Sequence, residues 1–258
     1  MSYDKTIFNT ILETFENEDI KKFAVECIDS ISEYIYSVPA SSTGKYHPKY
    51  ALNDGGLVRH TLALVRIMNH LFSIDCVKNQ FTSRERDLLR VAGLMHDTKK
   101  SGSQEEYEGN KFTKFNHPLL AADEVVRVWK TEMEHMITPD ELKIIYCSIR
   151  SHMGQWNTDK RSPGVELPLP QTKYEIMVHV CDYLASRKDI ELQFEYAHKD
   201  WPSSTFEKEL PDINTWKLPF GKYKGKTLLE IKSENPGYIK WAKENADSEP
   251  LKSLVAQI

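Results

Sequence analysis

The chain has 258 residues, of which 40% are hydrophobic, 10% aromatic and 28% charged, and its formal net charge is −4. This balance excludes a disordered chain and a fibrous repeat protein, and every apolar run is far shorter than the roughly 20 residues that cross a bilayer. Four scattered cysteines without a CxxC spacing predict free thiols. Because no signal peptide is visible at the N-terminus, we expect a soluble, cytoplasmic protein with no membrane partner.

Hydrophobic periodicity predicts a mainly α-helical fold over the first 200 residues. Helical patterns cover residues 3–15 and 20–36. Gly55-Gly56 then interrupts the chain before an amphipathic stripe at residues 58–72.

Start signals mark the following helices. Thr82 with Glu85 predicts a capping box, and Pro118 begins a pattern that extends to Met133. Thr138-Pro139-Asp140-Glu141 combines a capping threonine, a first-turn proline and a glutamate at the third position. Prolines predict an irregular loop at 161–171, and a further helix is expected from residue 174 to about 194.

The composition changes near residue 200, where we expect a boundary between a main domain, residues 1–205, and a small C-terminal module, residues 206–258. Residues 218–227 alternate like a short β-hairpin and precede one or two short helices, which predicts an α+β module. Seven lysines and two glutamates give residues 214–243 a charge of +5, so the rest of the chain carries −9. This stretch is either a solvated face or a surface for phosphate groups.

Histidines and aspartates stand at helix ends and on core-facing stripes. The set comprises His60, His96, Asp97, His117, His152 and Asp182. Buried carboxylates next to core histidines are costly unless a cation compensates them. Imidazole and carboxylate together suit divalent ions such as Mn, Fe, Co, Ni or Zn. Each residue alone is more often an ordinary histidine or aspartate, and the other five histidines have no such context.

In this order the set resembles the HD-domain metal-dependent phosphohydrolases. The resemblance covers about residues 35–195 and rests on GGLVRH at 55–60, GLMHDTKK at 93–100 and HVCDYLASR at 179–187. It implies a helical bundle in which His60, His96, Asp97 and Asp182 hold one metal ion. His117 and His152 match two histidines that add a second ion in part of that family.

The resemblance also implies roles for Asp97 and Lys100. Asp97 would bridge two divalent cations (Mn, Fe, Co, Ni, Zn or Mg) and a water that attacks phosphorus. Lys100 would offset charge on the phosphate oxygens. Lys99 stands where the common motif has glycine, which departs from the family in the local turn.

Other residues are candidates for substrate contact by position. Lys45 and His47 lie in the loop before His60, Arg150 and Trp156 flank His152, and Arg187 follows Asp182. Cations suit phosphate and an aromatic ring suits a base. A salt bridge or a surface ring is the ordinary alternative for each.

Residues 218–245 resemble the small module at the C-terminus of exodeoxyribonuclease X. In its FGKYKGK stretch, Lys222, Tyr223, Lys224 and Lys226 interleave cations with an aromatic, which fits single-stranded nucleic acid. A packing module with solvated lysines is the alternative.

The sequence therefore predicts metal-dependent hydrolysis of a phosphodiester in a nucleic acid or a cyclic (oligo)nucleotide. Two alternatives remain open: a nucleotidase or phosphohydrolase for free nucleotides, and a catalytically inert scaffold that binds nucleic acid. The complete ligand set argues against the scaffold.

Overall fold

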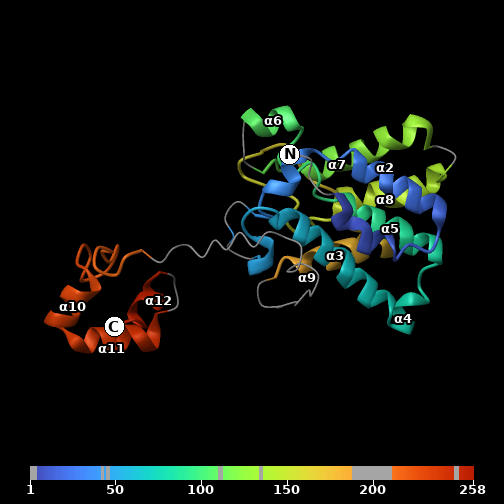
Figure 1. Cartoon of the computed structure of the whole chain (residues 1–258). Coiled ribbons are helices and arrows are strands. Elements are labelled where there is room, and N and C mark those ends of the chain that lie inside the picture. The colour runs from blue at the N-terminus through green and yellow to red at the C-terminus, as the bar shows by residue number, and fades with distance from the viewer. Residues whose placement is uncertain are drawn as a thin grey trace. The chain divides into compact units, whose positions relative to one another are not determined.

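A computed structural model describes residues 5–41, 44, 47–109, 113–133, 136–187, 211–246 and 250–258. The chain divides into two compact units, residues 1–202 and 203–258 (Figure 1). The expected boundary at residue 205 lies outside the described residues and stays a prediction. In the described part of the chain almost all regular structure is helical, which confirms the mainly α class. Among these residues no helix is both long and apolar enough to cross a membrane.

The first unit is built from helices of 4 to 17 residues, with short 3-10 turns between them. They are η1 (Lys5–Phe8), α1 (Asn9–Leu12), α2 (Glu18–Asp29), η2 (Glu33–Ser37), η3 (Lys49–Ala51), α3 (Gly56–Phe72), α4 (Asp75–Lys78), α5 (Ser83–Met95), α6 (Gln104–Gly109), α7 (His117–Val128), the π-helical turn η4 (Trp129–Met133), α8 (Pro139–Ser151) and α9 (Lys173–Ala185).

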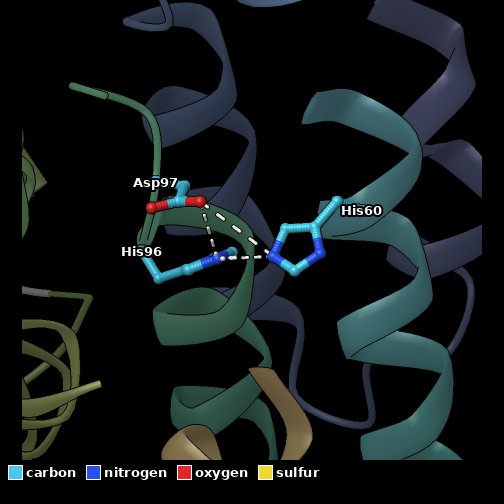
Figure 2. Close-up of side chains that lie close together, drawn as sticks. All are labelled: His60, His96 and Asp97. Carbon is cyan, nitrogen blue, oxygen red and sulfur yellow. Dashed lines mark hydrogen bonds and ion pairs between the residues drawn. The ribbon is translucent and has the colours of Figure 1, made fainter. Parts of the chain in front are cut away.

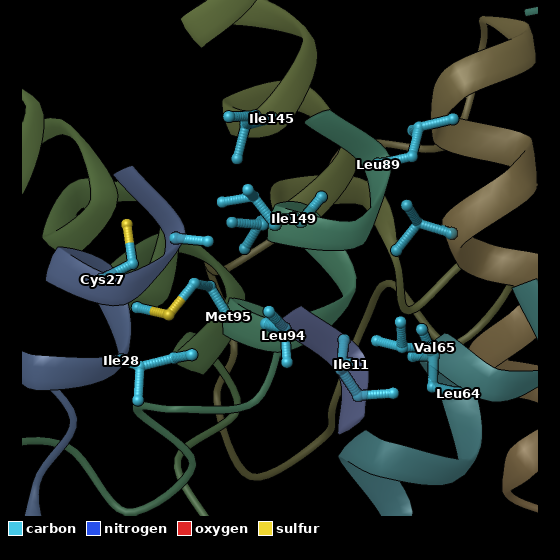
Figure 3. Packing of buried hydrophobic residues seen from close by; sticks show 14 of the residues in the cluster. Ile11, Cys27, Ile28, Leu64, Val65, Leu89, Leu94, Met95, Ile145 and Ile149 are labelled. Carbon is cyan, nitrogen blue, oxygen red and sulfur yellow. The ribbon is translucent and has the colours of Figure 1, made fainter. Parts of the chain in front are cut away.

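Helix α5 is the centre of this unit and packs against α2, α3, α7, α8 and α9 (Figure 1). Its apolar face meets residues from its neighbours in one continuous core, in which Leu64 of α3, Leu94 of α5 and Ile149 of α8 are fully buried (Figure 3). Burial of this apolar surface holds the helices at fixed positions. The ends of α5 and α8 are therefore held close together.

The Gly55-Gly56 pair forms the turn that starts α3. Gly55 has φ +69°, a conformation that glycine adopts without strain. At Gly56 a Cβ atom would lie 2.3 Å from the backbone oxygen of Ala51. Both positions need glycine, and the turn fixes where His60 lies on the first turns of the helix.

The predicted capping boxes are present. The Thr82 hydroxyl accepts from the Glu85 amide at 3.2 Å, and the Thr82 amide donates to the Glu85 carboxylate at 2.7 Å. Thr138 and Glu141 make the same pair of bonds at the start of α8. These caps satisfy amides at the helix start that have no intrahelical partner.

Three predicted helices end earlier than expected. Residues 5–12 form a 3-10 turn followed by a single α-helical turn, and α2 ends at Asp29 where the pattern continued to residue 36. Ser30 closes α2 by donating its hydroxyl to the Cys27 oxygen at 2.8 Å, which competes with further helix. Helix α9 ends at Ala185, and residues 188–194 lie outside the described residues.

The second unit contains α10 (Leu228–Glu234), α11 (Pro236–Asn245) and α12 (Leu251–Val255), which enclose a separate small core. The predicted β-hairpin at 218–227 is wrong, because the structure has no β-strands in these residues. One antiparallel bridge joins Lys217 and Thr227, and turns fill the space between them. Gly221 and Gly225 have positive φ, which bends the chain too often for a ladder to extend.

Candidate metal centre

The six metal-ligand candidates come from the first turns or the ends of five helices. His60 lies on α3, His117 begins α7 and Asp182 lies on α9. His96 directly follows the last residue of α5 and is followed by Asp97. His152 directly follows the last residue of α8. Packing of these helices around α5 brings the six side chains together.

One group consists of His60, His96 and Asp97, whose ligand atoms all lie within 4.8 Å of one another (Figure 2). The two Nε2 atoms are 3.3 Å apart, and Asp97 Oδ2 is 3.4 Å from that of His96 and 4.0 Å from that of His60. Asp182 adjoins the group, because its Oδ1 is 2.9 Å from His60 Nε2 and 3.6 Å from His96 Nε2. Four donor groups therefore point toward one small region.

A second group consists of Asp97, His117 and His152. Asp97 Oδ1 lies 2.9 Å from His117 Nε2 and 3.6 Å from His152 Nε2. All three side chains are almost completely buried. Asp97 thus belongs to both groups, with one carboxylate oxygen in each.

Three of the histidines are oriented by the same local device. The Nδ1 atoms of His96, His117 and His152 lie 2.7–2.8 Å from the backbone oxygens of the third residue before each, Gly93, Lys114 and Ile149. A carbonyl oxygen only accepts, so each Nδ1 carries the proton and the Nε2 of the neutral ring offers a lone pair. This is the arrangement by which proteins commonly prepare histidine for a metal ion.

Several buried polar atoms of this centre have no hydrogen-bond partner in the described part of the chain. They include Asp97 Oδ1 and His117 Nε2, which lie 2.9 Å apart without hydrogen-bond geometry, and His60 Nδ1. Unpaired buried polar groups are costly. Imidazole nitrogens and carboxylate oxygens converging in this way fit divalent cations.

The charges of the two aspartates persist in spite of burial. Burial raises the pKa of Asp97, but the Lys100 ammonium and the neighbouring imidazoles outweigh it and hold that pKa well below its usual range. Lys100 forms an ion pair with Asp97 Oδ2. Burial likewise raises the pKa of Asp182, and its contacts with His60 and His96 lower it further than burial raises it. Both groups are therefore carboxylates at neutral pH, as metal ligands must be.

A family model described as HD domain matches residues 57–187, the segment that carries all six side chains. The chain belongs to the HD-domain family. Its HD domain places it in a class of metal-dependent hydrolases. A second model, described as exodeoxyribonuclease X-like C-terminal, matches residues 218–247. Comparison with curated proteins found no significant match. Comparison with solved structures found none either.

The residues of the HD domain that were predicted to contact substrate have different surroundings in the structure. Lys45 lies outside the described residues. The His47 ring lies edge-on to that of His60, with centroids 5.4 Å apart. Arg150 packs its guanidinium over the Tyr146 ring at 5.0 Å. The Arg187 guanidinium lies over the Tyr183 ring, 5.1 Å from its centre, and the Trp156 ring also stacks on Tyr183. Contact of these residues with substrate stays a prediction.

A pocket that sequence reasoning missed opens beside the metal centre. It has a volume of about 230 Å³, and its walls include His117 and Trp156. Phe115, Asp159 and Arg161 also line it. No spacing in the sequence signals this pocket, because its residues come from two loops that only packing brings together.

His179 also has a role that the sequence did not reveal. Its Nδ1 donates to the backbone oxygen of His152 at 2.8 Å, and a side chain at Gly154 would collide with its ring. His179 therefore holds the chain just after α8, where His152 must point inward. Its position one turn before Asp182 is the single hint in the sequence.

In the C-terminal module the predicted nucleic-acid residues divide into exposed and occupied side chains. Lys222 and Lys224 are exposed. Tyr223 is a correction: its ring is 8% exposed within the small core, and its hydroxyl accepts from Asn235, so it is not a free stacking surface. Lys226 pairs with Glu234. Among the described residues of the module, the exposed aromatic side chains are Phe220, at 50%, and Trp241, at 54%.

Proposed function

We propose that the HD domain hydrolyses a phosphodiester, in a nucleic acid or a cyclic (oligo)nucleotide, with two divalent cations. The observation that carries this proposal is the overlap of two ligand groups at Asp97, one on each carboxylate oxygen. A carboxylate shared in this way is the usual centre of a two-metal hydrolytic site.

The chain's own residues supply what such a reaction needs around the cations. When bound, the cations would lower the pKa of water and neutralise charge on the phosphate. His60, His96, Asp97 and Asp182 would hold one, and Asp97, His117 and His152 the other. Lys100, paired with Asp97 Oδ2, places a positive charge where a phosphate oxygen can approach.

Two features favour nucleic acid over a free nucleotide as substrate. The C-terminal module resembles that of an exodeoxyribonuclease. Its residues 214–243 carry +5, whereas the rest of the chain carries −9 and repels a polyanion. The exposed lysines and aromatic rings of the module suit a single strand, whose bases are available for stacking.

The test is a substrate panel with full-length protein freed of metal and then reloaded with Mn²⁺, Fe²⁺, Co²⁺, Ni²⁺, Zn²⁺ or Mg²⁺. The panel contains bis-p-nitrophenyl phosphate, single-stranded RNA and DNA oligonucleotides, cyclic dinucleotides, and nucleoside mono- and triphosphates. We expect hydrolysis of diesters that requires metal and is absent in Asp97→Asn. Exclusive release of phosphate from mononucleotides would replace this proposal with a nucleotidase. Metal binding without any hydrolysis would indicate an inert scaffold.

A further inference from the structure

The pocket beside His117 is large enough for a small part of a substrate and lies next to the metal centre. Its volume is about 230 Å³, below the roughly 300–1,000 Å³ of pockets that enclose a drug-sized ligand. His117 forms part of its wall, and the Nε2 atom of His117 is 2.9 Å from Asp97 Oδ1. A group in the pocket therefore lies close to the candidate metal centre.

Part of the pocket lining is apolar and aromatic. Phe115, Met153 and Trp156 form it. The indole ring of Trp156 stacks on the Tyr183 ring, with centroids 5.7 Å apart and planes 12° from parallel. Arg187 in turn lies over the Tyr183 ring. Tyr183 follows Asp182 directly, so the indole plane is held by the same helix that carries a metal-ligand candidate.

The loop between α8 and α9 supplies a polar part of the pocket lining. Thr158, Asp159 and Arg161 form it. The loop is closed by a bridge between Thr158 and Glu166 and by a bond from the Leu167 amide to the Asn157 oxygen. The Asp159 carboxylate accepts from the Arg161 amide at 3.0 Å and pairs with its guanidinium at 3.1 Å. The pocket lining thus combines aromatic rings with hydrogen-bonding groups.

We infer that this pocket binds the nucleobase of a nucleotide adjoining the scissile phosphate, an inference that rests on the proposed function. Aromatic rings and hydrogen-bonding groups in one pocket match the flat face and polar edge of a base. A phosphate is a less suitable occupant, because three apolar side chains line the pocket and its Arg161 guanidinium is already paired with Asp159.

The test compares two esters that differ in the presence of a base. Full-length, metal-loaded protein is assayed with cytidine 5′-(p-nitrophenyl phosphate) and with methyl p-nitrophenyl phosphate. The ratio of the two kcat/KM values is measured. In Trp156→Ala we expect this ratio to fall about tenfold, within the range for loss of one base stack. Trp156→Phe should restore most of it. Leu169→Ala, which removes another exposed apolar side chain of the loop between α8 and α9, should leave the ratio unchanged.

Failure of this inference is distinguishable from failure of the proposed function. If the wild-type protein hydrolyses both esters and Trp156→Ala has the same ratio, the pocket does not bind the base. If neither ester is hydrolysed, calorimetric titration of metal-free protein with cytidine monophosphate decides about the pocket, and the proposed function fails only if no diester of the substrate panel is hydrolysed either. Equal affinity for wild type and Trp156→Ala, or no binding by either, would overturn the inference there too.

Discussion

Asp97 differs from the histidines around it because it belongs to both ligand groups. Its two carboxylate oxygens face different sets of Nε2 atoms, and Lys100 pairs with one of those oxygens. Each histidine belongs to a single group. Loss of Asp97 and loss of one histidine should therefore have different effects on metal content.

We expect wild-type protein to bind two divalent ions per chain, His117→Ala and His152→Ala to bind about one, and Asp97→Ala to bind none at stoichiometric level. The reason is that removal of His117 or His152 leaves His60, His96, Asp97 and Asp182 intact. Elemental analysis of Mn²⁺-loaded, dialysed protein measures this directly. Full metal content in Asp97→Ala would contradict the assignment, and one ion in the wild type would reduce the site to a mononuclear centre.

Lys100 and its neighbour Lys99 offer a matched pair for testing a charge at the site. Lys100 pairs with Asp97, whereas Lys99 pairs with Glu124 at 3.6 Å, and the two side chains are equally buried. Lys100→Met should lower kcat on the order of 100-fold, as loss of a group that stabilises transition-state charge does, with metal content retained. Lys99→Met should keep wild-type kcat. Equal kcat values in the two variants would show that Lys100 has no special role.

At the scale of elements, the site depends on where helices start and end. His96 and His152 follow the last residues of α5 and α8, and helix ends leave carbonyl oxygens without an intrahelical partner. Two of the carbonyls that hold the rings belong to these last turns. The end of each helix, α5 and α8, thus provides the carbonyl oxygen that orients the histidine following it.

The start of α3 provides a stability test. In Gly56→Ala the new methyl group would lie 2.3 Å from the Ala51 oxygen, so the turn before His60 must shift. We expect the free energy of unfolding to fall by about 1–3 kcal/mol, as for other overpacked sites, and metal affinity to fall with it. Chemical denaturation measures the first effect. Gly237→Ala is the control, because its nearest neighbour is a side-chain atom at 3.2 Å. Equal stability of Gly56→Ala and wild type would show that the turn relaxes freely.

At the scale of the whole molecule, charge is divided between the two units. The basic residues 214–243 belong to the second unit, and the metal-ligand candidates belong to the acidic first unit. Attraction for a polyanion should therefore come from the C-terminal module, while hydrolysis comes from the HD domain.

This division predicts the salt dependence of oligonucleotide binding by the full-length chain. Lys222→Gln with Lys224→Gln should reduce the slope of log K against log salt by about 1.4, since each phosphate contact on a single strand contributes ~0.7. Lys226→Gln should change it less, because Glu234 already neutralises that lysine. Fluorescence anisotropy at several salt concentrations gives the slopes. An unchanged slope in the double variant would assign the module to packing and favour a small nucleotide as substrate.

The sequence by itself determined the features that depend on local spacing. Capping pairs such as Thr138 with Glu141 identify helix starts because both partners lie within one turn. The order and context of His60, His96, Asp97, His117, His152 and Asp182 are also properties of the chain as written, so the family could be recognised before any geometry was known.

Tertiary structure decided the features that depend on contacts between distant segments. The pocket joins Phe115 to Trp156, and His179 supports His152, because helix packing brings these residues together. Tyr223 looked like a surface ring in its basic stretch, but the small core of the module buries it. Burial and pairing are set by which faces the helices turn toward one another, and that choice minimises exposed apolar area over the whole unit and not within any one segment.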